Sequence, residues 1–263
     1  MRILVILRRV LDPAGIVAHR RLRRLFINRE EYLIQPGDHS ALEAALRIKD
    51  LGGPEVVVVS GQPEPDDDTV CRGLAMGADG AIYLSGEGFA GADDGVAARL
   101  LQAVVDRLGG ADLVLVGMTT LDTAQAQLGP RLAGALGWPQ IVGAWSVEIV
   151  DGRVRAVRRD GDDYVVVETD LPAVVTVPGR ALEPRYPDGA RLVNVYRGEG
   201  GMGEAVLRWD VADLLHPEGL VPLLENRGRD FPPERELGVR VEGTTEEVAQ
   251  AVAEALRARL RGA

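Results

Sequence analysis

Short, continuously apolar runs alternate with segments of helical periodicity along much of the chain, and this alternation strongly restricts the fold. The runs are rich in Val, Ile and Leu, which is typical of strands buried on both faces of a parallel sheet. Strands are expected at 2–10, 56–59, 81–84, 112–116 and 173–177. Helices are expected at 39–51, from the acidic run 66–68 to Gly77, at 93–108 and at 121–136. This order predicts an α/β fold with a doubly wound, mainly parallel sheet and right-handed crossovers.

The periodicity changes to strict alternation before the last of these strands. Segments 146–150, 154–159 and 164–169 are separated by turn residues, so they predict an inserted antiparallel hairpin layer. Beyond the α/β domain, expected at 1–190, the sequence loosens into a C-terminal arm over 191–263, with the glycine-rich stretch 198–203 and the turn-forming stretch 222–233. A short helix is expected at 209–215 and a terminal helix at 244–260. The terminal helix is expected to dock on a partner, with folding back on its own domain as an equal alternative.

Charge and cysteine content exclude several classes of protein. The 263 residues include 30 Lys plus Arg and 40 Asp plus Glu, and the net charge of -10 opposes non-specific nucleic-acid binding. The single cysteine, Cys71, cannot form an internal disulfide and is expected in the core of a helix. No signal-peptide pattern and no apolar run of about 20 residues is present. We expect a soluble, cytoplasmic protein without direct membrane insertion or a metal site.

A ligand of such a sheet lies beyond the carboxyl ends of its strands, near the point where the strand order reverses. The loops to consider are 8–15, 60–65 and 117–127. In the last, Gly117 ends a strand and small hydroxyl residues precede the expected helix, so unpaired N–H groups would face an anion. Asp122 could instead accept from those amides as a helix cap. The loop therefore predicts an anion site, with capping as the alternative.

Catalytic motifs are missing from the sequence. No G-x-G-x-x-G follows the first strand, and neither a P-loop nor a G-x-S-x-G elbow occurs. Acidic residues cluster only in solvated runs, and the histidines are expected at caps or on the surface. We expect no catalytic residue in this chain, which would bind a nucleotide while a cofactor or a partner performs the chemistry.

Several segments, in order along the chain, resemble the β subunit of electron transfer flavoprotein, also called the FixA-type subunit. They are Arg2–Asp12 (RILVILRRVLD), Gln35–Asp38 followed by Ala41–Leu46, Leu74–Asp79 (LAMGAD), Asp122–Arg131 followed by Leu136–Pro139 (LGWP), Leu171–Thr176 (LPAVVT) and Glu183–Tyr186 (EPRY). The resemblance extends over the first 190 residues or so, and the tail is similar to the family's as well. It implies a Rossmann-like, adenine-nucleotide-binding domain.

The resemblance also implies a cofactor site and a partner. In the family the β subunit binds AMP or a second FAD and pairs with an α subunit that carries a redox-active FAD. The implied cofactor-binding residues are Ile6, Gln35, Pro36, Gly37, Asp38, Gly61, Gly117, Asp122, Thr123, Ala124, Gln125, Ala126, Gln127 and Leu128. The phosphate would lie against the amides of 122–127, in the loop that the anion argument also selects.

Two further surfaces are implied by the resemblance. Arg8, Arg9 and Pro13 would face the flavin of the partner, where an arginine could stabilise the reduced, anionic form, unless these arginines are only solvated charges. The stretch 178–186 would dock a redox partner through Ala181, Glu183, Pro184, Arg185 and Tyr186. The chain departs from the family pattern at four places: Gln35 stands for Asn, Gly37 for an aromatic residue, Thr123–Ala124 for acids, and Ala181 for an anchoring leucine. Because Ala181 lacks the side chain of that anchor, the set of redox partners is expected to differ.

The function expected from the resemblance is that of a β-type electron carrier subunit, not an enzyme. With its FAD-carrying α subunit it would relay electrons between dehydrogenases and the respiratory chain or another acceptor. The alternative is a stand-alone nucleotide-binding module of the universal-stress type, which shares the α/β scaffold. The sequence leaves open AMP versus FAD, electron bifurcation, NADH binding and the dehydrogenase served.

Overall fold

The computed structural model describes residues 1–63, 68–89, 92–197, 205–224, 227, 231 and 238–261. They fall into two compact units, Met1–Arg227 and Gly228–Ala263. The predictions for Asp66 and Asp67, for the glycine-rich stretch 198–203 and for most of 222–233 lie outside the described residues. Each unit is described separately.

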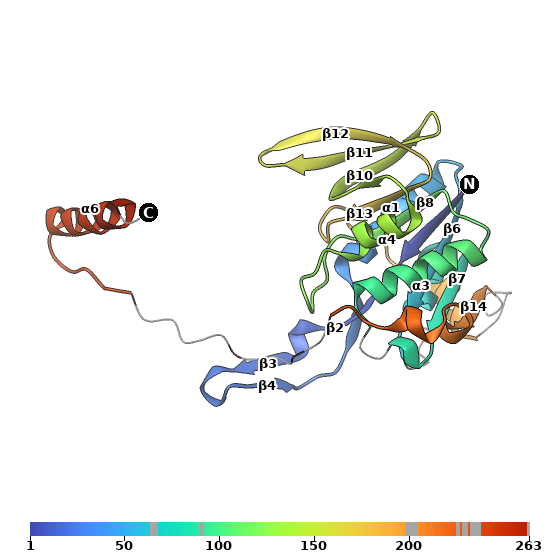
Figure 1. Ribbon diagram of the computed structural model, residues 1–263, viewed down its shortest axis with the longest axis horizontal. Helices are drawn as coiled ribbons and strands as arrows, with labels where there is room; N and C mark the ends of the chain where they lie inside the picture. The colour runs from blue at the N-terminus through green and yellow to red at the C-terminus, as the bar shows by residue number, and fades with distance from the viewer. Residues whose placement is uncertain are drawn as a thin grey trace. The chain divides into compact units, whose positions relative to one another are not determined.

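The first unit is built on a seven-stranded sheet in the order β14-β7-β6-β1-β8-β13-β9 (Figure 1). Every neighbouring pair in it is parallel. Its strands are β1 (Arg2–Ile6), β6 (Glu55–Gly61), β7 (Gly80–Ser85), β8 (Leu113–Gly117), β9 (Gln140–Ile141), β13 (Ala173–Val177) and β14 (Val206–Asp210). The chain runs from β1 outward to β7 and then returns to β8 on the other side of β1. This reversal confirms the doubly wound α/β fold.

Helices cover both faces of the sheet, as the apolar runs predicted. Ile3 and Val5 of β1 pack into the cluster that contains α1 (Pro36–Asp50) and α2 (Asp68–Met76). The alternate residues Leu4 and Ile6 pack into the cluster that contains α3 (Asp94–Arg107) and α4 (Leu128–Leu136). Side chains alternate along a strand, so a strand covered on both faces needs an unbroken apolar sequence. Cys71 is buried in α2, as expected.

The inserted antiparallel layer is confirmed, with strands β10 (Ala144–Val150), β11 (Arg153–Asp160) and β12 (Asp163–Asp170). Its inward-facing residues Val147, Val154 and Ala156 join the core cluster on the α1 side of the main sheet. The two polar turns that connect its strands lie at the positions that the sequence predicted.

The prediction of one strand over 2–10 is wrong. The central strand ends at Ile6, and the chain then forms β2 (Arg9–Leu11), which pairs antiparallel with β5 (Tyr32–Ile34). Between them a second hairpin, β3 (Ile16–His19) and β4 (Arg24–Ile27), was not predicted. The strand stops because Arg8 turns to a buried carboxylate, described below.

Two helix predictions are also wrong. The segment 121–127 is a loop, and the helix expected over 121–136 begins only at Leu128. The segment expected as a helix over 209–215 contains the end of strand β14, which extends the sheet beside β7, followed by a short 3-10 turn, Val211–Asp213. Helix α5 (Gly189–Arg197), which contacts α2, was not predicted. Residues 191–227, expected in the arm, are part of the unit Met1–Arg227.

The second unit contains α6 (Thr245–Arg261), close to the helix expected at 244–260. Its predicted capping box is present: Thr244 N donates to Glu247 Oε2 at 2.7 Å, and Glu247 N donates to Thr244 Oγ1 at 3.4 Å. Within the described residues, none of the helices combines the length and the apolar composition that crossing a bilayer requires.

Two glycines of α4 differ sharply in their surroundings, and this gives a test of the packing. A Cβ added at Gly129 would overlap Thr176 Cγ2 on β13, whereas a Cβ at Gly134 would meet nothing within 4 Å. We expect Gly129→Ala to lower the free energy of unfolding by about 2 kcal/mol, because α4 must move off the sheet. Gly134→Ala is the control and should be neutral or stabilising by up to about 1 kcal/mol. Urea unfolding measures both, and equal effects would contradict the packing described.

Candidate functional site

The predicted cofactor residues gather at the carboxyl edge of the main sheet, where the strand order reverses. Ile6 ends β1, Gly61 ends β6 and Gly117 ends β8, and β1 lies between the other two strands. Gln35–Asp38 form the start of α1. The loop 118–127 follows β8 and leads into α4. Residues far apart in the sequence therefore meet where an open α/β sheet binds its ligand.

Asp38 holds this edge together. Its fully buried carboxylate accepts four hydrogen bonds: from Arg8 N at 2.8 Å, Arg8 Nε at 2.9 Å, Arg8 Nη2 at 2.8 Å and Gly117 N at 2.7 Å. Arg8 Nη2 also donates to the carbonyl of Gly117 at 2.8 Å. Asp38 was predicted as a cofactor-binding residue, and in the structure its carboxylate binds Arg8 and Gly117. These hydrogen bonds fix the ends of β1 and β8 relative to α1.

Glycine is required where α1 approaches β8. A Cβ on Gly37 would lie 2.9 Å from Gly117 Cα, and a Cβ on Gly117 would lie 2.5 Å from Asp38 Oδ1. Both distances are too short for a side chain. The aromatic residue expected from the family pattern at position 37 would not fit this arrangement. Gly61 is similarly close to Phe89, whose ring covers the end of β6.

Gln35, which precedes α1, leaves a buried polar atom unsatisfied. The residue is only 3% exposed, its N–H donates to the carbonyl of Arg8 at 2.9 Å, and its Oε1 has no partner among the described residues. A buried acceptor of this kind normally receives a hydrogen bond from protein, water or ligand. The atom is therefore suited to a donor group of a ligand at this edge.

The loop 118–127 is exposed and ordered by its own hydrogen bonds. Ala124 N donates to the carbonyl of Thr120 at 3.0 Å, and Thr120 N donates to that of Gln125 at 3.2 Å. Ala124 has a φ of 55°, a left-handed conformation that costs a non-glycine residue about 1 kcal/mol. Asp122 accepts from Thr123 N at 2.7 Å, so it caps this turn and not the helix that was expected to begin there.

Three main-chain N–H groups in this loop and at the start of α4 have no protein acceptor among the described residues. Within the part of the chain that the structure describes, the N–H groups of Gln125, Ala126 and Leu128 donate to no acceptor. Leu128 is the first residue of α4, so its amide adds to the positive end of the helix dipole. Such N–H groups are suited to a phosphate, so the anion site predicted for this loop stays a prediction, with the helix starting later than expected.

Two charged residues beside the loop were missed. The carboxyl of Asp94, the first residue of α3, lies near the main-chain amide of Gln127 and near Arg131, and Arg131 Nε donates to Gln127 Oε1 at 3.0 Å. Burial raises the pKa of Asp94, although the charges of Arg8 and Arg131 act in the opposite direction. Asp94 follows the third strand at a predicted helix start, so its position at the same edge could have been deduced from the strand order.

The three residues predicted to face a flavin differ in their surroundings. Arg8 is mostly buried, and Asp38 neutralises its charge. Arg9 lies over the ring of Tyr32, 3.8 Å from its centroid, and donates to Gln62 Oε1 at 3.2 Å. Pro13 is exposed at the start of a 3-10 turn, Pro13–Gly15. Of the two arginines, Arg9 is therefore the one whose charge is not matched by Asp38.

The predicted docking stretch 178–186 is tied to α1 through Arg185. Its guanidinium contacts the buried Glu43 at 2.9 Å and Asp50 at 2.8 Å, and Arg185 N donates to Glu43 Oε2 at 3.1 Å. Ser40 Oγ donates to the carbonyl of Leu182 at 3.0 Å. Tyr186 is 94% exposed, whereas Ala181 and Pro184 are half-buried and Glu183 is exposed. The stretch presents Tyr186 and Glu183 on a fixed backbone.

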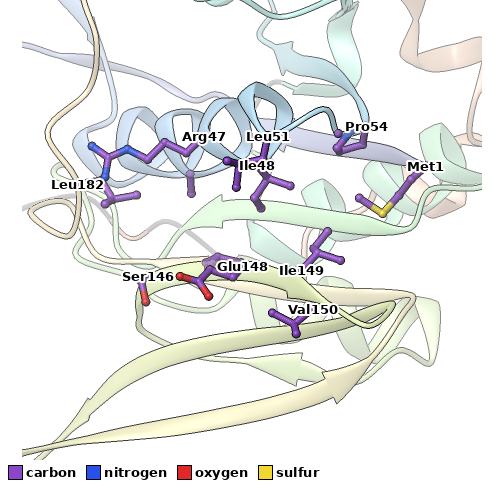
Figure 2. A pocket seen from close by; sticks show the side chains of 13 residues that line it. Met1, Arg47, Ile48, Leu51, Pro54, Ser146, Glu148, Ile149, Val150 and Leu182 are labelled. Carbon is purple, nitrogen blue, oxygen red and sulfur yellow. The ribbon is translucent and has the colours of Figure 1, made fainter.

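A cavity of about 620 Å³ lies elsewhere, between α1 and β10 (Figure 2). Its apolar wall includes Ile48 of α1, Leu51 directly after that helix and Ile149 of β10. Met1 and Pro54 mark the amino ends of β1 and β6. None of the predicted cofactor residues lines it. Since open α/β sheets bind ligands at the opposite edge, we retain the loop 118–127 as the candidate site.

Asp38→Asn tests the buried carboxylate. The variant keeps the shape of the side chain but leaves the guanidinium of Arg8 without its counter-charge. We expect a loss of about 3 kcal/mol in the free energy of unfolding, as for other buried ion pairs that lose one partner. Asp122→Asn, in the exposed loop, is the control and should change it by less than about 0.5 kcal/mol. Similar losses in both variants would refute this role of Asp38.

Glu43→Gln tests the clamp on the docking stretch. Burial alone would raise the pKa of Glu43, but hydrogen bonds from Arg185 and Arg47 lower it below its usual value. A lowered pKa stabilises the fold above the unfolded-state value of about 4.3, and this contribution is lost as the pH falls through the folded-state pKa. We expect Glu43→Gln to cost about 2 kcal/mol at pH 7 and progressively less below pH ~4.

The control for Glu43→Gln is Glu55→Gln, which removes an exposed ion pair with Arg2. Exposed pairs contribute about 0–1 kcal/mol, so this variant should be nearly neutral. Urea unfolding at several pH values provides the comparison. A cost of Glu43→Gln that stays constant down to pH ~2 would contradict the lowered pKa.

Comparison with known proteins agrees with the geometry. The model of the electron transfer flavoprotein domain matches residues 25–199. The chain is 32% identical over 250 residues to "Caffeyl-CoA reductase-Etf complex subunit CarD" of Acetobacterium woodii, covering 93% of each chain. It is 33% identical over 215 residues to the electron transfer flavoprotein subunit beta of Clostridium acetobutylicum, covering 81% of this chain and 80% of the relative.

A third relative is "Protein FixA" of Azorhizobium caulinodans, 34% identical over 220 residues, which cover 81% of this chain and 76% of the relative. The recognisable segments, the fold and these matches agree with one another. The chain therefore belongs to the electron transfer flavoprotein family, as a protein of the β or FixA type, and its role is electron transfer and not enzymatic catalysis.

Proposed function

We propose that this chain binds an adenine nucleotide, AMP or the adenylate half of FAD, and pairs with an α subunit that carries a redox-active FAD. The heterodimer relays electrons between a dehydrogenase or reductase and a further acceptor in the cytoplasm. The observation that carries the proposal is the exposed loop 118–127, which follows β8 at the reversal of the strand order and has main-chain N–H groups without a protein acceptor among the residues that the structure describes.

The charges at this edge indicate how a phosphate would be held. Asp38 neutralises Arg8, and Asp94 and Asp122 lie near the same guanidinium. Side-chain charge therefore gives little net attraction for an anion. The N–H groups of Gln125, Ala126 and Leu128 supply the attraction instead, together with the dipole of α4. AMP bound here would have a structural role only. FAD bound here would also supply reversible electron transfer.

The partner assignment is supported by the names of the relatives. One is a subunit of a caffeyl-CoA reductase–Etf complex, and another is an acryloyl-CoA reductase electron transfer subunit. We infer that this chain likewise works inside an assembly, with Pro13 and Arg9 toward the flavin and with Glu183 and Tyr186 toward a redox partner. The terminal helix α6, with Val252, Leu256 and Leu260 exposed, is assigned to the contact with the α subunit.

The proposal is tested by co-expressing the chain with an α-type subunit of the family. We expect a yellow heterodimer with a flavin absorption spectrum, and acid extraction should release FAD with or without AMP in a fixed ratio to protein. A colourless homodimer that carries ATP would instead support the universal-stress alternative.

Ala126→Asp tests the phosphate loop. Ala126 is exposed, so the variant should fold, but it places a carboxylate beside the open amides. Two like charges about 4 Å apart repel by roughly 4 kcal/mol at an effective dielectric constant of 20, so nucleotide affinity should fall at least about tenfold. Ala126→Asn introduces a side chain of the same size as aspartate without its charge, so this control variant should bind the nucleotide with nearly normal affinity. Unchanged nucleotide content in the Asp variant would refute the assignment of this loop.

A further inference from the structure

The hairpin β3–β4 leaves apolar side chains exposed on both of its faces. Its register pairs Ile16 with Ile27 and Ala18 with Leu25 on one face, and Val17 with Phe26 on the other. Val17 is 45% exposed and Phe26 41%, and Ile16, Leu25 and Ile27 are exposed as well. Isolated two-stranded ribbons are marginally stable in water, so one with two apolar faces needs a cover on each side.

The base of the hairpin is fixed. Asp12 N donates to the carbonyl of Glu31 at 2.8 Å, and Asn28 N donates to that of Gly15 at 2.9 Å. A Cβ on Gly15 would overlap the carbonyl oxygen of Arg29, so the two chains approach as closely as glycine allows. Figure 1 shows β3 and β4 extending away from the seven-stranded sheet. The hairpin is therefore a preformed arm of the first unit.

The tip of the arm is basic in a chain of net charge -10. Arg20, Arg21 and Arg24 are exposed and form no ion pair with any described residue. Arg24 stands opposite His19 in the ribbon. The surface that complements this hairpin is an apolar cleft for the side chains of the strands, with acidic groups at its far end for the arginines of the tip.

We propose that the hairpin β3–β4 is an arm that inserts into such a cleft on the flavin-carrying α-type sister subunit. This rests on the function proposed above. The arm follows directly on Pro13–Gly15, the turn assigned to the flavin side, so it continues the surface that this subunit would occupy. A membrane fits the hairpin less well than a protein cleft. A lipid surface would cover only one face of the ribbon, and insertion by the tip would bury the arginines in hydrocarbon.

The experiment compares two valines on exposed strands in the purified heterodimer. Val17→Asp changes the arm, and Val166→Asp changes the outer strand β12, where Val166 is 63% exposed. Affinity for the α-type subunit is measured by titration, and hydrogen exchange of amides 16–27 is compared with and without that subunit. We expect Val17→Asp to weaken the heterodimer at least tenfold, Val166→Asp to leave it unchanged, and the arm's amides to become protected.

Arg21→Glu is a second variant at the tip, in case Val17→Asp does not fold. It should weaken the heterodimer and reduce the dependence of its affinity on salt. Wild-type affinity in both arm variants, with unprotected amides in a heterodimer that forms normally, would overturn the proposal while leaving the proposed function intact. No heterodimer with the unaltered chain would overturn both.

Two other outcomes would also overturn the arm proposal. One is binding of the unaltered chain to phosphatidylglycerol vesicles that Arg21→Glu abolishes while the heterodimer is unaffected, which would assign the arm to a lipid surface. The other is a homodimer in sedimentation that Val17→Asp dissociates, which would assign it to a second copy of this chain.

Discussion

The buried carboxylate of Asp38 determines how the carboxyl edge of the sheet is built. A charge removed from water is costly unless ion pairing and hydrogen bonds compensate it. Asp38 accepts from Arg8 and from Gly117, and these contacts draw together the turn after β1, the first turn of α1 and the end of β8. The need for glycine at positions 37 and 117 follows from that close approach, because any side chain there would separate the three segments.

The same pairing determines which groups can attract a ligand. Since Arg8 is neutralised, the candidate anion site depends on main-chain N–H groups, and every residue except proline supplies one. A site of this kind would not need the acids that Thr123 and Ala124 replace in the family pattern. It would depend on the geometry of the loop, which bonds such as that from Ala124 N to the carbonyl of Thr120 determine. Asp94 and Arg131 then adjust the charge beside the loop.

The sequence predicted the features whose causes are local. Continuous apolar runs identified the parallel strands, and alternation identified the layer β10–β12, because periodicity is a property of neighbouring residues. It did not predict where β1 ends, since Arg8 resembles a strand residue until its partner 30 positions away is known. Strand β14 forms because it pairs with the edge strand β7. Helix α4 starts late because residues of the preceding loop form hydrogen bonds with one another. Such features arise from tertiary contacts.

Helix α1 connects the candidate nucleotide edge with the predicted docking stretch. It carries two buried carboxylates, Asp38 toward β1 and β8, and Glu43 toward Arg185. Five residues along a helix correspond to about 7.5 Å and roughly 140° of rotation, so the two groups grip different parts of the molecule from different sides. If either carboxylate moved away from its arginine, a buried charge would lose its partner. The loop that would hold a phosphate and the stretch that would meet a redox partner are therefore kept in register by one rigid element.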